Sequence, residues 1–492
     1  MGCMLPRPLI GFNQRDAGEA IGMFFDRLPC PRVYQSLYNA RLNMKRASLH
    51  TLGCRLNQAE TFVLESRLRK EGYELVAFGQ PTDLLVVNTC SVTKEAERTC
   101  RYVVRKTLKH SPGAFVAVTG CYAQTGGQEL RSMTGVDLIV GNQFKWDLPS
   151  MLPAPEHLRK SPKPEVVHSK TIDRDDFVLP EYGTPDSTRA SVKIQDGCNV
   201  MCSFCLIPFA RGHERSRVLE DTLQEAAMLA EAGYREIVLT GVNIGRYRQD
   251  GRGLPALIDA LERIDGLERI RISSIEPTTI DEGLIERMAA SSKLCPYLHV
   301  PLQSGDDAIL SAMNRPYRVR DFVKLIERVV RTVPSLGLGT DVMVGFPGES
   351  EEAFLNTVRL AETLPFSYLH VFPFSPRPGT AAVRLNGCVP GGVVRERAMR
   401  LAALDRAKRM LFAERHIGST VPILFEAGET CDFAVGTAPN FLRVAVASSD
   451  SLTNTVRSVR ISAASERGAV GQIVPLRPAS KALPTISLVP MS

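Results

Sequence analysis

Short apolar runs alternate with amphipathic segments over the first third of the chain. Apolar runs bounded by Gly, Asn or Thr are typical of buried strands, whereas apolar residues at helical spacing are typical of helices that cover a sheet. Strands and helices that alternate in this way predict an open, mostly parallel sheet. The pattern predicts strands at 47–53, 83–90, 114–121 and 136–142, and helices at 57–72 and 94–110.

A second alternating series begins near residue 188. Six strand–helix units are fewer than the eight of a closed (β/α)8 barrel, so we expect a partial (β/α)6 barrel with its site at the carboxyl ends of the strands. The predicted strands are 190–195, 236–241, 269–276, 297–302, 338–346 and 368–375, and the predicted helices are 219–233, 254–264, 279–291, 319–333 and 350–364.

The pattern changes again near the end of the chain. A helix rich in Arg and Lys is predicted at 393–416, followed by short strands at 421–427, 441–447 and 456–463 with Gly, Asn and Ser between them. Short strands of this kind predict a small antiparallel barrel of the oligonucleotide-binding type.

These changes predict an α/β multidomain protein. Residues 1–43 show no sustained period and are expected to be a disordered extension, or to precede a native start at Met44. Residues 151–187 are rich in Pro and are expected to be a linker. The remaining units are expected at 44–150 for the sheet domain, 188–416 for the barrel, 417–477 for the small barrel and 478–492 for a tail.

Composition places the chain among soluble globular proteins. It has 492 residues, 44% of them hydrophobic and 23% charged, with a net charge of +7. This positive charge suits a polyanionic partner without requiring one. There is no apolar run long enough to cross a bilayer and no secretory signal, so we expect a cytoplasmic protein without a membrane partner.

Three of the twelve cysteines lie within eight positions, directly after a predicted strand: Cys198, Cys202 and Cys205. Cytosolic thiols are kept reduced, so clustered cysteines favour metal binding over disulfides. Structural zinc normally takes four protein ligands, whereas an iron–sulfur cluster held by three thiolates leaves one iron open. A zinc knuckle completed by His213, or a chance cluster of thiols, is the alternative.

A second cysteine trio is spread along the first domain. Cys54, Cys90 and Cys121 each end a predicted strand, and a parallel sheet would bring them to one edge. A single such thiol would be read as a core cysteine, but three at equivalent positions predict a shared metal site. The other six are expected to be structural or incidental: Cys3, Cys30, Cys100, Cys295, Cys388 and Cys431.

The CxxxCxxC motif with Phe204 resembles the hallmark of the radical S-adenosylmethionine (SAM) enzymes, and "DGCNVMCSFCLIPFARGHERSR" at 196–217 resembles their methylthiotransferase branch. The resemblance implies that the first trio holds a 4Fe-4S cluster whose open iron binds SAM, and that an electron from it cleaves SAM to a 5′-deoxyadenosyl radical. It also implies that the second trio holds an auxiliary 4Fe-4S cluster that supplies or carries sulfur.

The same resemblance implies a SAM pocket at the strand ends of the barrel. Its segments are "LTGVNIG", "RISSIEP", "HVPLQSG" and "GTDVMVGFPGE". Gly at a strand end also serves turns, and Glu276 is equally explained as a structural carboxylate. The implied pocket residues are Thr240, Gly241 and Asn243 near the methionine amino group, Ser274 and Glu276 near the methionine and ribose, Gln303, and Asp341, Val344 and Phe204 near the adenine.

Finally, "TLGCRLNQAE", "IQDGCN" and "CLIPFARG" resemble the branch that acts on N6-threonylcarbamoyladenosine in tRNA. This implies a reaction that replaces the C2 hydrogen of that adenine by a methylthio group. The implied partners are a tRNA anticodon loop, a reductase system such as flavodoxin or ferredoxin, and a sulfur donor. The alternative substrates are isopentenyl-adenosine tRNA and a ribosomal protein aspartate. An alternative from another class of function is a non-catalytic zinc protein that binds RNA.

Basic residues and the last domain bear on RNA binding. Arg211, Arg215 and Arg217 lie just beyond the first trio and are expected to track phosphates or to lie on solvated faces. The last domain resembles the TRAM module, a small RNA-binding barrel. Its modest charge suggests that affinity comes partly from the preceding helix and from base stacking.

Overall fold

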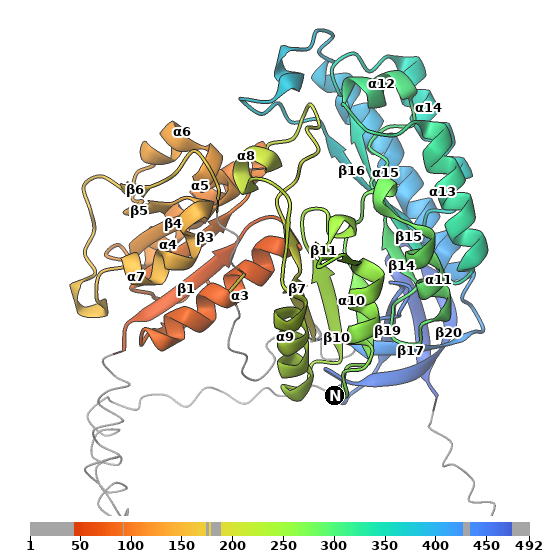
Figure 1. Cartoon of the computed structure of the whole chain (residues 1–492), viewed down its shortest axis with the longest axis horizontal. Helices are drawn as coiled ribbons and strands as arrows, with labels where there is room; N and C mark the ends of the chain where they lie inside the picture. Colours follow the sequence, from red (N-terminus) through yellow and green to blue (C-terminus); the bar gives the residue numbers. More distant parts are fainter. Residues whose placement is uncertain (1–43, 92, 174–176, 179–187, 427–432, 475–492) are drawn as a thin grey trace, which may run out of the picture.

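The structure is a computed structural model that describes residues 44–91, 93–173, 177–178, 188–426 and 433–474 (Figure 1). The predicted extension at 1–43 and the tail at 478–492 lie outside the described residues, as do Cys3, Cys30 and Cys431. Over the described ranges, every helix is too short or too polar to span a membrane.

The first domain contains a six-stranded sheet in which all neighbouring strands are parallel, in the order β2-β1-β3-β4-β5-β6. The predicted open sheet is therefore confirmed. The strands are β1 (Arg46–Thr51), β2 (Glu74–Leu75), β3 (Leu84–Thr89), β4 (Phe115–Gly120), β5 (Leu138–Val140) and β6 (Glu165–Val167).

Strand β6 corrects one expectation, because it comes from the range 151–187 that was expected to be a linker. Its three residues pair in parallel with β5, Leu138 opposite Glu165. A strand this short, next to Pro164 and within a Pro-rich stretch, gives no hydrophobic period that the sequence alone reveals.

Helices cover both faces of this sheet. Leu84 and Val86 of β3 pack with residues of α3 (Arg55–Lys70), whereas Leu85 and Val87 pack with residues of α4 (Lys94–His110). Strands buried on both faces read as continuous apolar runs, as β3 and β4 do. The short helices are α5 (Cys121–Thr125), α6 (Gly127–Arg131), η1 (Asn142–Asp147), α7 (Leu148–Met151) and η2 (Pro155–His157).

The second domain is a half-open barrel of six parallel strands. It consists of two sheets in the orders β13-β10-β7 and β14-β15-β16, which isolated bridges at Ile270↔Leu294 and Ser274↔His299 connect. The predicted partial barrel is confirmed. Its strands are β7 (Arg189–Lys193), β10 (Glu236–Thr240), β13 (Arg269–Ile272), β14 (Tyr297–His299), β15 (Gly337–Val344) and β16 (Tyr368–Pro373).

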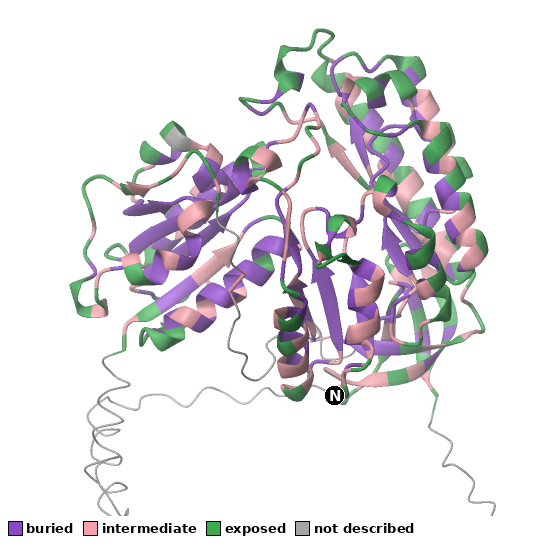
Figure 2. Cartoon of the chain, viewed as in Figure 1, coloured by how far each residue is buried: buried purple, intermediate pink, exposed green. Residues whose placement is uncertain are grey.

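Helices surround the outside of this barrel, with their exposed faces toward solvent (Figures 1 and 2). They are α9 (Leu219–Glu231), α10 (Leu254–Leu261), α11 (Glu282–Ala290), α13 (Val319–Thr332) and α14 (Glu351–Thr363). Shorter elements at the rim are β8 (Gln195–Asp196), α8 (Ile207–Arg211), β9 (Arg215–Ser216), η3 (Ile244–Arg246), β11 (Arg248–Gln249), β12 (Arg252–Gly253), η4 (Pro277–Thr279), α12 (Asp307–Ala312) and η5 (Ala381–Arg384).

The barrel strands are apolar outside and polar inside. Ile237 and Leu239 of β10 belong to the large apolar cluster under the outer helices. Because side chains alternate along a strand, Glu236 of β10 and Arg271 of β13 point inward. Both are buried and form an ion pair with a distance of 2.7 Å. The interior is therefore built for polar or charged groups.

The chain ends in a closed five-stranded barrel, which confirms the predicted small barrel although the sequence indicated only some of its strands. The strand order is β17-β18-β19-β21-β20. The long helix α15 (Gly391–Glu414) leads into it, and the strands are β17 (Thr420–Phe425), β18 (Phe433–Thr437), β19 (Arg443–Ala447), β20 (Val456–Ser465) and β21 (Gly468–Ile473).

This small barrel closes the amino-terminal end of the larger one. Arg271 donates to the backbone oxygens of Ala438 and Pro439, at 3.2 and 2.8 Å, while it pairs with Glu236. Arg269 donates to the Thr437 oxygen at 2.9 Å. Although burial alone raises the pKa of Glu236, Arg271 holds it below its usual range. Arg269 also pairs with Glu236 at 3.6 Å, so one buried carboxylate anchors two arginines that join the domains.

We expect Glu236→Gln to destabilise this junction by about 3–5 kcal/mol, because two buried arginines would lose their counter-charge. Chemical denaturation followed by circular dichroism measures the loss. The matched control is Glu268→Gln, which removes an exposed partner of Arg235 and should cost less than about 1 kcal/mol. An unfolding midpoint equal to that of the wild type would contradict the role of Glu236.

Candidate cluster and cofactor sites

The first cysteine trio lies on the loop between β8 and α8, beyond the carboxyl end of β7. Two of the sulfurs accept hydrogen bonds from the backbone. Cys198 accepts from the Val200 N–H at 3.3 Å, and Cys205 accepts from the Ile207 N–H at 3.4 Å. Hydrogen bonds to sulfur are among the means by which proteins tune iron–sulfur clusters. The loop thus offers three half-buried sulfurs in a polar cradle.

Arg315 supplies the third sulfur contact, and sequence reasoning missed it. Its Nη1 lies 3.2 Å from Cys202 Sγ, and its Nη2 pairs with Glu276. Glu276, which the sequence placed near SAM, is thus held by an arginine that also contacts the trio. Arg315 comes from the loop before α13, and a single arginine in a loop gives no sequence signal of such a contact.

The thiols affect one another's protonation. Burial raises the pKa of Cys205 to about 12, and the nearby Cys202 and Cys198 contribute to the rise. Burial also raises the pKa of Cys202, against the opposing effect of Arg315. Three neighbouring thiols become thiolates together only when a metal supplies the positive charge, so the donor set fits a metal cluster.

The surroundings of the first trio disfavour a single zinc ion. Zn–S bonds of about 2.3 Å require the ligands of one tetrahedral site to lie close together. Structural zinc also takes four protein ligands. His213, the suggested fourth zinc ligand, is exposed and contacts Asn199 at 3.2 Å. A cluster that needs only three protein ligands suits the first trio better.

The second trio meets at the carboxyl edge of the first sheet. Cys54 precedes α3, Cys90 follows β3 and Cys121 opens α5 after β4. Their strands are neighbours in the order β1-β3-β4. Parallel strands end at one edge, so the structure places the three residues together there.

Two glycines make this convergence possible. Gly53 has φ +95°, and a Cβ there would lie 2.7 Å from the Cys90 sulfur. Gly120 has φ +99°, and a Cβ there would lie 2.4 Å from the Thr89 oxygen. Both positions therefore require glycine, because any side chain would push the cysteine-bearing segments apart.

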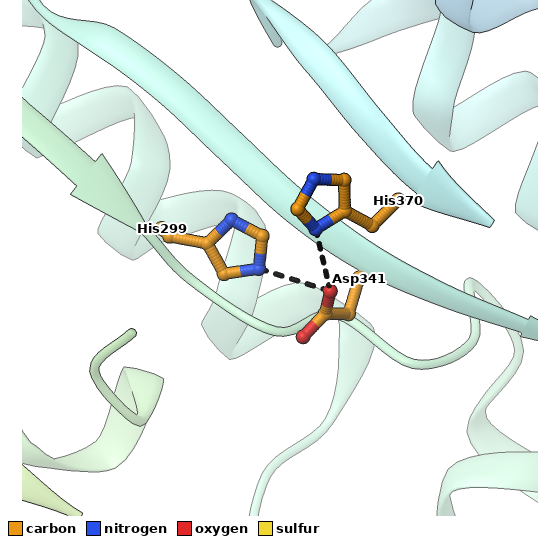
Figure 3. A group of neighbouring side chains, drawn as sticks. All are labelled: His299, Asp341 and His370. Carbon is orange, nitrogen blue, oxygen red and sulfur yellow. Dashed lines mark ion pairs between the residues drawn. The ribbon is translucent and has the colours of Figure 1, made fainter. Parts of the chain in front are cut away.

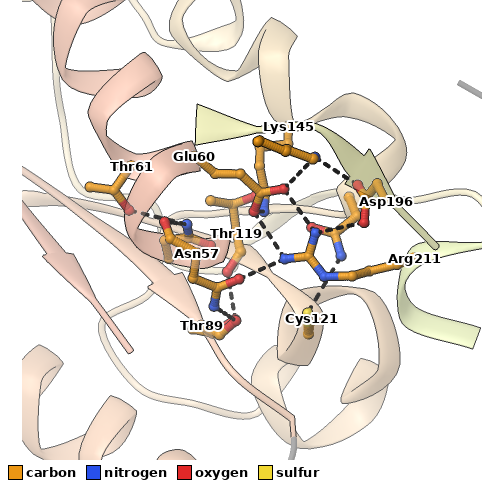
Figure 4. A network of polar contacts seen from close by, with 12 residues as sticks. Asn57, Glu60, Thr61, Thr89, Thr119, Cys121, Lys145, Asp196 and Arg211 are labelled. Carbon is orange, nitrogen blue, oxygen red and sulfur yellow. Dashed lines mark hydrogen bonds and ion pairs between the residues drawn. The ribbon is translucent and has the colours of Figure 1, made fainter. Parts of the chain in front are cut away.

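A buried network of charges joins the two cysteine sites (Figure 4). Arg211, at the end of α8, is 2% exposed and binds Glu60 of α3 at 2.8 Å and Asn57 at 2.7 Å. Glu60 also pairs with Lys145 at 2.6 Å and with Lys193 at 2.8 Å. Several cations thus converge on one carboxylate.

The network reaches the second cysteine trio. Asn142 donates to the Ala210 oxygen at 2.7 Å and approaches the Cys121 sulfur at 3.9 Å. Although burial alone lowers the pKa of Arg211, Cys121 and Glu60 raise it well above its usual range. A permanent cation from the first site therefore faces a sulfur of the second.

This network corrects the expectation for the arginines after the first trio. Arg211 and Arg217 are each 2% exposed, so they neither track phosphates nor lie on a solvated face. Arg217 pairs with Glu225. Arg215 pairs with Asp196 at 3.0 Å. These arginines are structural, since their partners compensate their charges inside the protein.

The residues predicted for the SAM pocket lie around the carboxyl ends of the barrel strands. Thr240 ends β10, Gly241 follows it, and Ser274 forms a bridge to His299 of β14. Phe204 lies against Phe346 with ring centroids 6.5 Å apart. Val344 is fully buried among apolar residues outside the barrel, so only its backbone faces the strand ends.

Two buried amides at these strand ends fit a polar ligand. Both polar atoms of the Asn243 side chain, and the Gln303 side-chain oxygen, are buried without a hydrogen-bond partner in the described structure. Gln303 also has φ +66°, which costs energy for a residue other than glycine. Unpaired buried amides are costly, and a polar ligand such as SAM would pair them.

Asp341 lies beside the expected pocket through its backbone. Its backbone oxygen accepts from the Gln303 N–H at 2.8 Å, next to the expected pocket. Its carboxylate points inward to His299, at 3.0 Å. The backbone of Asp341, and not its carboxylate, therefore contacts Gln303 beside the expected SAM pocket.

Comparison with known proteins finds two family models that match parts of this chain. A family model described as "Radical SAM superfamily" matches residues 192–361, and one described as "Uncharacterized protein family UPF0004" matches residues 46–141. These ranges contain the two cysteine trios. Among solved structures, the radical S-adenosylmethionine methyltransferase TsrM from Kitasatospora setae is 15% identical with a TM-score of 0.49, over 78% of this chain and 79% of that one.

Curated relatives align over most of the chain. "Threonylcarbamoyladenosine tRNA methylthiotransferase MtaB" from Bacillus subtilis is 36% identical over 85% of this chain and 94% of its own length. The protein of the same name from Aquifex aeolicus is 38% identical, over 77% and 92%. A "tRNA-2-methylthio-N(6)-dimethylallyladenosine synthase" from Cereibacter sphaeroides is 36% identical, over 87% and 98%. With both cysteine-bearing segments matched and the alignments spanning the domains described above, the chain belongs to the radical SAM methylthiotransferase family.

Proposed function

We propose that the protein is a tRNA methylthiotransferase that converts N6-threonylcarbamoyladenosine next to the anticodon to its 2-methylthio derivative. The observation that carries the proposal is the pair of cysteine trios at the carboxyl ends of two parallel sheets, joined through Arg211. Relatives named for this substrate are 33–38% identical to the chain. Relatives named for dimethylallyladenosine are 32–36% identical, so the substrate needs its own test.

Each trio would hold one 4Fe-4S cluster, with Cys198, Cys202 and Cys205 for the first. When bound there, the cluster supplies the electron that cleaves SAM to methionine and a 5′-deoxyadenosyl radical. Arg315 fixes Cys202 and Glu276 relative to each other. The trio of Cys54, Cys90 and Cys121 would hold the auxiliary cluster at the edge that faces α8.

SAM would bind at the strand ends of the barrel. The side chains of Asn243 and Gln303 offer unpaired polar atoms for its amino acid and ribose groups. Phe204, packed beside Phe346, offers apolar surface for the adenine. The complete proposed set is Phe204, Thr240, Gly241, Asn243, Ser274, Glu276, Gln303, Asp341 and Val344.

The substrate would be an anticodon loop, whose unpaired bases can be turned into a cleft at low cost. Helix α4 begins near Cys90 and carries basic residues toward solvent, with Tyr102 59% exposed among them. An exposed aromatic ring among cations suits base stacking and phosphate contacts. The basic residues of this helix are Arg98, Arg101, Arg105, Lys106 and Lys109.

The remaining assignments follow from this chemistry. A reductase system such as flavodoxin or ferredoxin would supply the electrons for SAM cleavage, and a sulfur donor would replace the sulfur that is inserted. With a tRNA substrate, we propose a cytoplasmic location. We propose that the first domain covers 44–150 together with β6, that the barrel covers 188–416, and that the small barrel at 417–477 is a TRAM-type RNA-binding module.

Anaerobic purification is expected to yield about eight irons per chain with equivalent labile sulfide, because two trios would each hold a four-iron cluster. Iron and sulfide assays on the full chain measure this. Zinc in place of iron, without labile sulfide, would contradict the enzymatic proposal and favour the zinc RNA-binding alternative.

Deletion of the gene is expected to remove 2-methylthio-N6-threonylcarbamoyladenosine from tRNA and to leave its unmethylthiolated precursor. Mass spectrometry of tRNA nucleosides measures both. The wild-type gene should restore the nucleoside, and Cys202→Ala should not. Loss of the methylthio derivative of isopentenyl-adenosine instead would identify the rival substrate.

Substitution of the two trios should separate the two half-reactions. We expect Cys90→Ala to retain SAM cleavage and to abolish methylthiolation, because it removes a ligand from the auxiliary site alone. Cys202→Ala should abolish both. Chromatography of 5′-deoxyadenosine and of the modified nucleoside measures each activity.

The matched control for this pair is Cys100→Ala, a buried thiol of α4 that belongs to neither trio. It should keep both activities. Loss of SAM cleavage in Cys90→Ala would show that the two sites do not work separately.

A further inference from the structure

Three side chains with metal-binding groups meet inside the barrel, and none of them is a cysteine of either trio (Figure 3). His299, Asp341 and His370 come from the adjacent strands β14, β15 and β16. Asp341 lies directly opposite His370 in the pairing of β15 with β16. Their neighbours Leu298 and Val342 pack in the apolar clusters outside, so strand alternation turns all three inward.

The distances between these ligand atoms match those between neighbouring ligands of one metal ion. His299 Nε2 lies 3.0 Å and His370 Nδ1 lies 3.5 Å from Asp341 Oδ1. For bonds of about 2.0–2.2 Å to nitrogen and oxygen, neighbouring ligands of a four- to six-coordinate ion lie roughly 3.0–3.5 Å apart. All three ligand atoms lie within 4.8 Å of one another.

A second layer of contacts orients His299. Its Nδ1 lies 2.9 Å from the Tyr368 hydroxyl, which in turn lies 2.6 Å from the Tyr297 hydroxyl. The His299 side chain is 5% exposed, so its ring is fixed by packing as well. A histidine that binds a metal through one ring nitrogen usually has the other nitrogen hydrogen-bonded in this way.

The negative charge of Asp341 also favours a bound cation. Its side chain is 24% exposed, and its ion-pair partners in the described structure are the two imidazoles, with no lysine or arginine within pairing distance. Elsewhere in the interior, Glu60 and Glu236 each have permanent cations as partners. Buried charges are usually paired or bound to a metal, and a divalent cation here would supply the positive charge that neutral imidazoles lack.

We propose that His299, Asp341 and His370 form a site for one divalent transition-metal ion of the zinc class. Two imidazoles and one carboxylate suit zinc and its neighbours in the transition series rather than magnesium or calcium. His370 is 59% exposed, so one side of the site is open. Water or an oxygen group of a ligand would complete the coordination there.

Zinc titration of the anaerobically prepared holoenzyme tests the site. We expect each chain to bind one zinc ion in addition to the iron of the clusters. This zinc should stay bound through gel filtration, and elemental analysis measures it. His370→Ala removes an exposed ligand with little effect on folding, and it should lower zinc affinity at least tenfold in calorimetry. The matched control, His110→Ala, removes an exposed histidine of α4 and should leave the affinity unchanged.

A second variant tests the orienting contact. Tyr368→Phe keeps all three ligands but removes the hydroxyl that holds His299, and it should lower zinc affinity about 10–100-fold. Absence of zinc beyond the cluster sites, equal affinity in the wild type and His370→Ala, or zinc uptake matched by loss of iron would each overturn the proposal. None of these outcomes depends on the tRNA substrate, so the proposed function would stand.

Discussion

The contact of Arg211 with Glu60 holds the two catalytic domains in one arrangement. Burial of a guanidinium and a carboxylate costs several kcal/mol per ion unless good geometry and further hydrogen bonds repay it. Here Arg211 also binds Asn57, and Glu60 also binds Lys145 and Lys193. Because Arg211 comes from the barrel and Glu60 from the first domain, these groups are satisfied only when the domains are docked. The interface is therefore specific in orientation, since any shift would leave buried charges unpaired.

This arrangement brings two strand-end sites face to face. Ligands of α/β sheets bind beyond the carboxyl ends of their strands, and docking through α8 turns that edge of the first sheet toward the rim of the barrel. Helix α8 begins two residues after Cys205, ends at Arg211 and packs against α5, the helix that Cys121 opens. A substrate held between the trios would be within reach of chemistry at both, as sulfur insertion requires.

The sequence was sufficient to predict the elements whose signal is local. The buried strands β3 and β4 are continuous apolar runs, and Cys90 and Cys121 end them, so sheet topology alone places their thiols together. Contacts between distant residues were not predictable. Arg211 and Glu60 are separated by 151 positions, and Arg315 and Cys202 by 113. An arginine after a cysteine motif looks the same in sequence whether it meets RNA or a buried carboxylate, because only the docked fold determines which anion it faces.

The interior of the barrel is organised in layers from its closed end to its open end. At the closed end, Glu236 and Arg271 meet the loop of the small barrel, and Phe441 of that loop stacks against Tyr297 with centroids 4.6 Å apart. The hydroxyls of Tyr297 and Tyr368 form the next contact, and they lead to His299 and the carboxylate of Asp341. Each of these contacts holds the next one toward the open end in place. The small barrel therefore closes one end of the larger barrel and also supports the polar groups nearer its other end. A small barrel whose role is RNA binding would thereby also hold His299 and Asp341 in position inside the larger barrel.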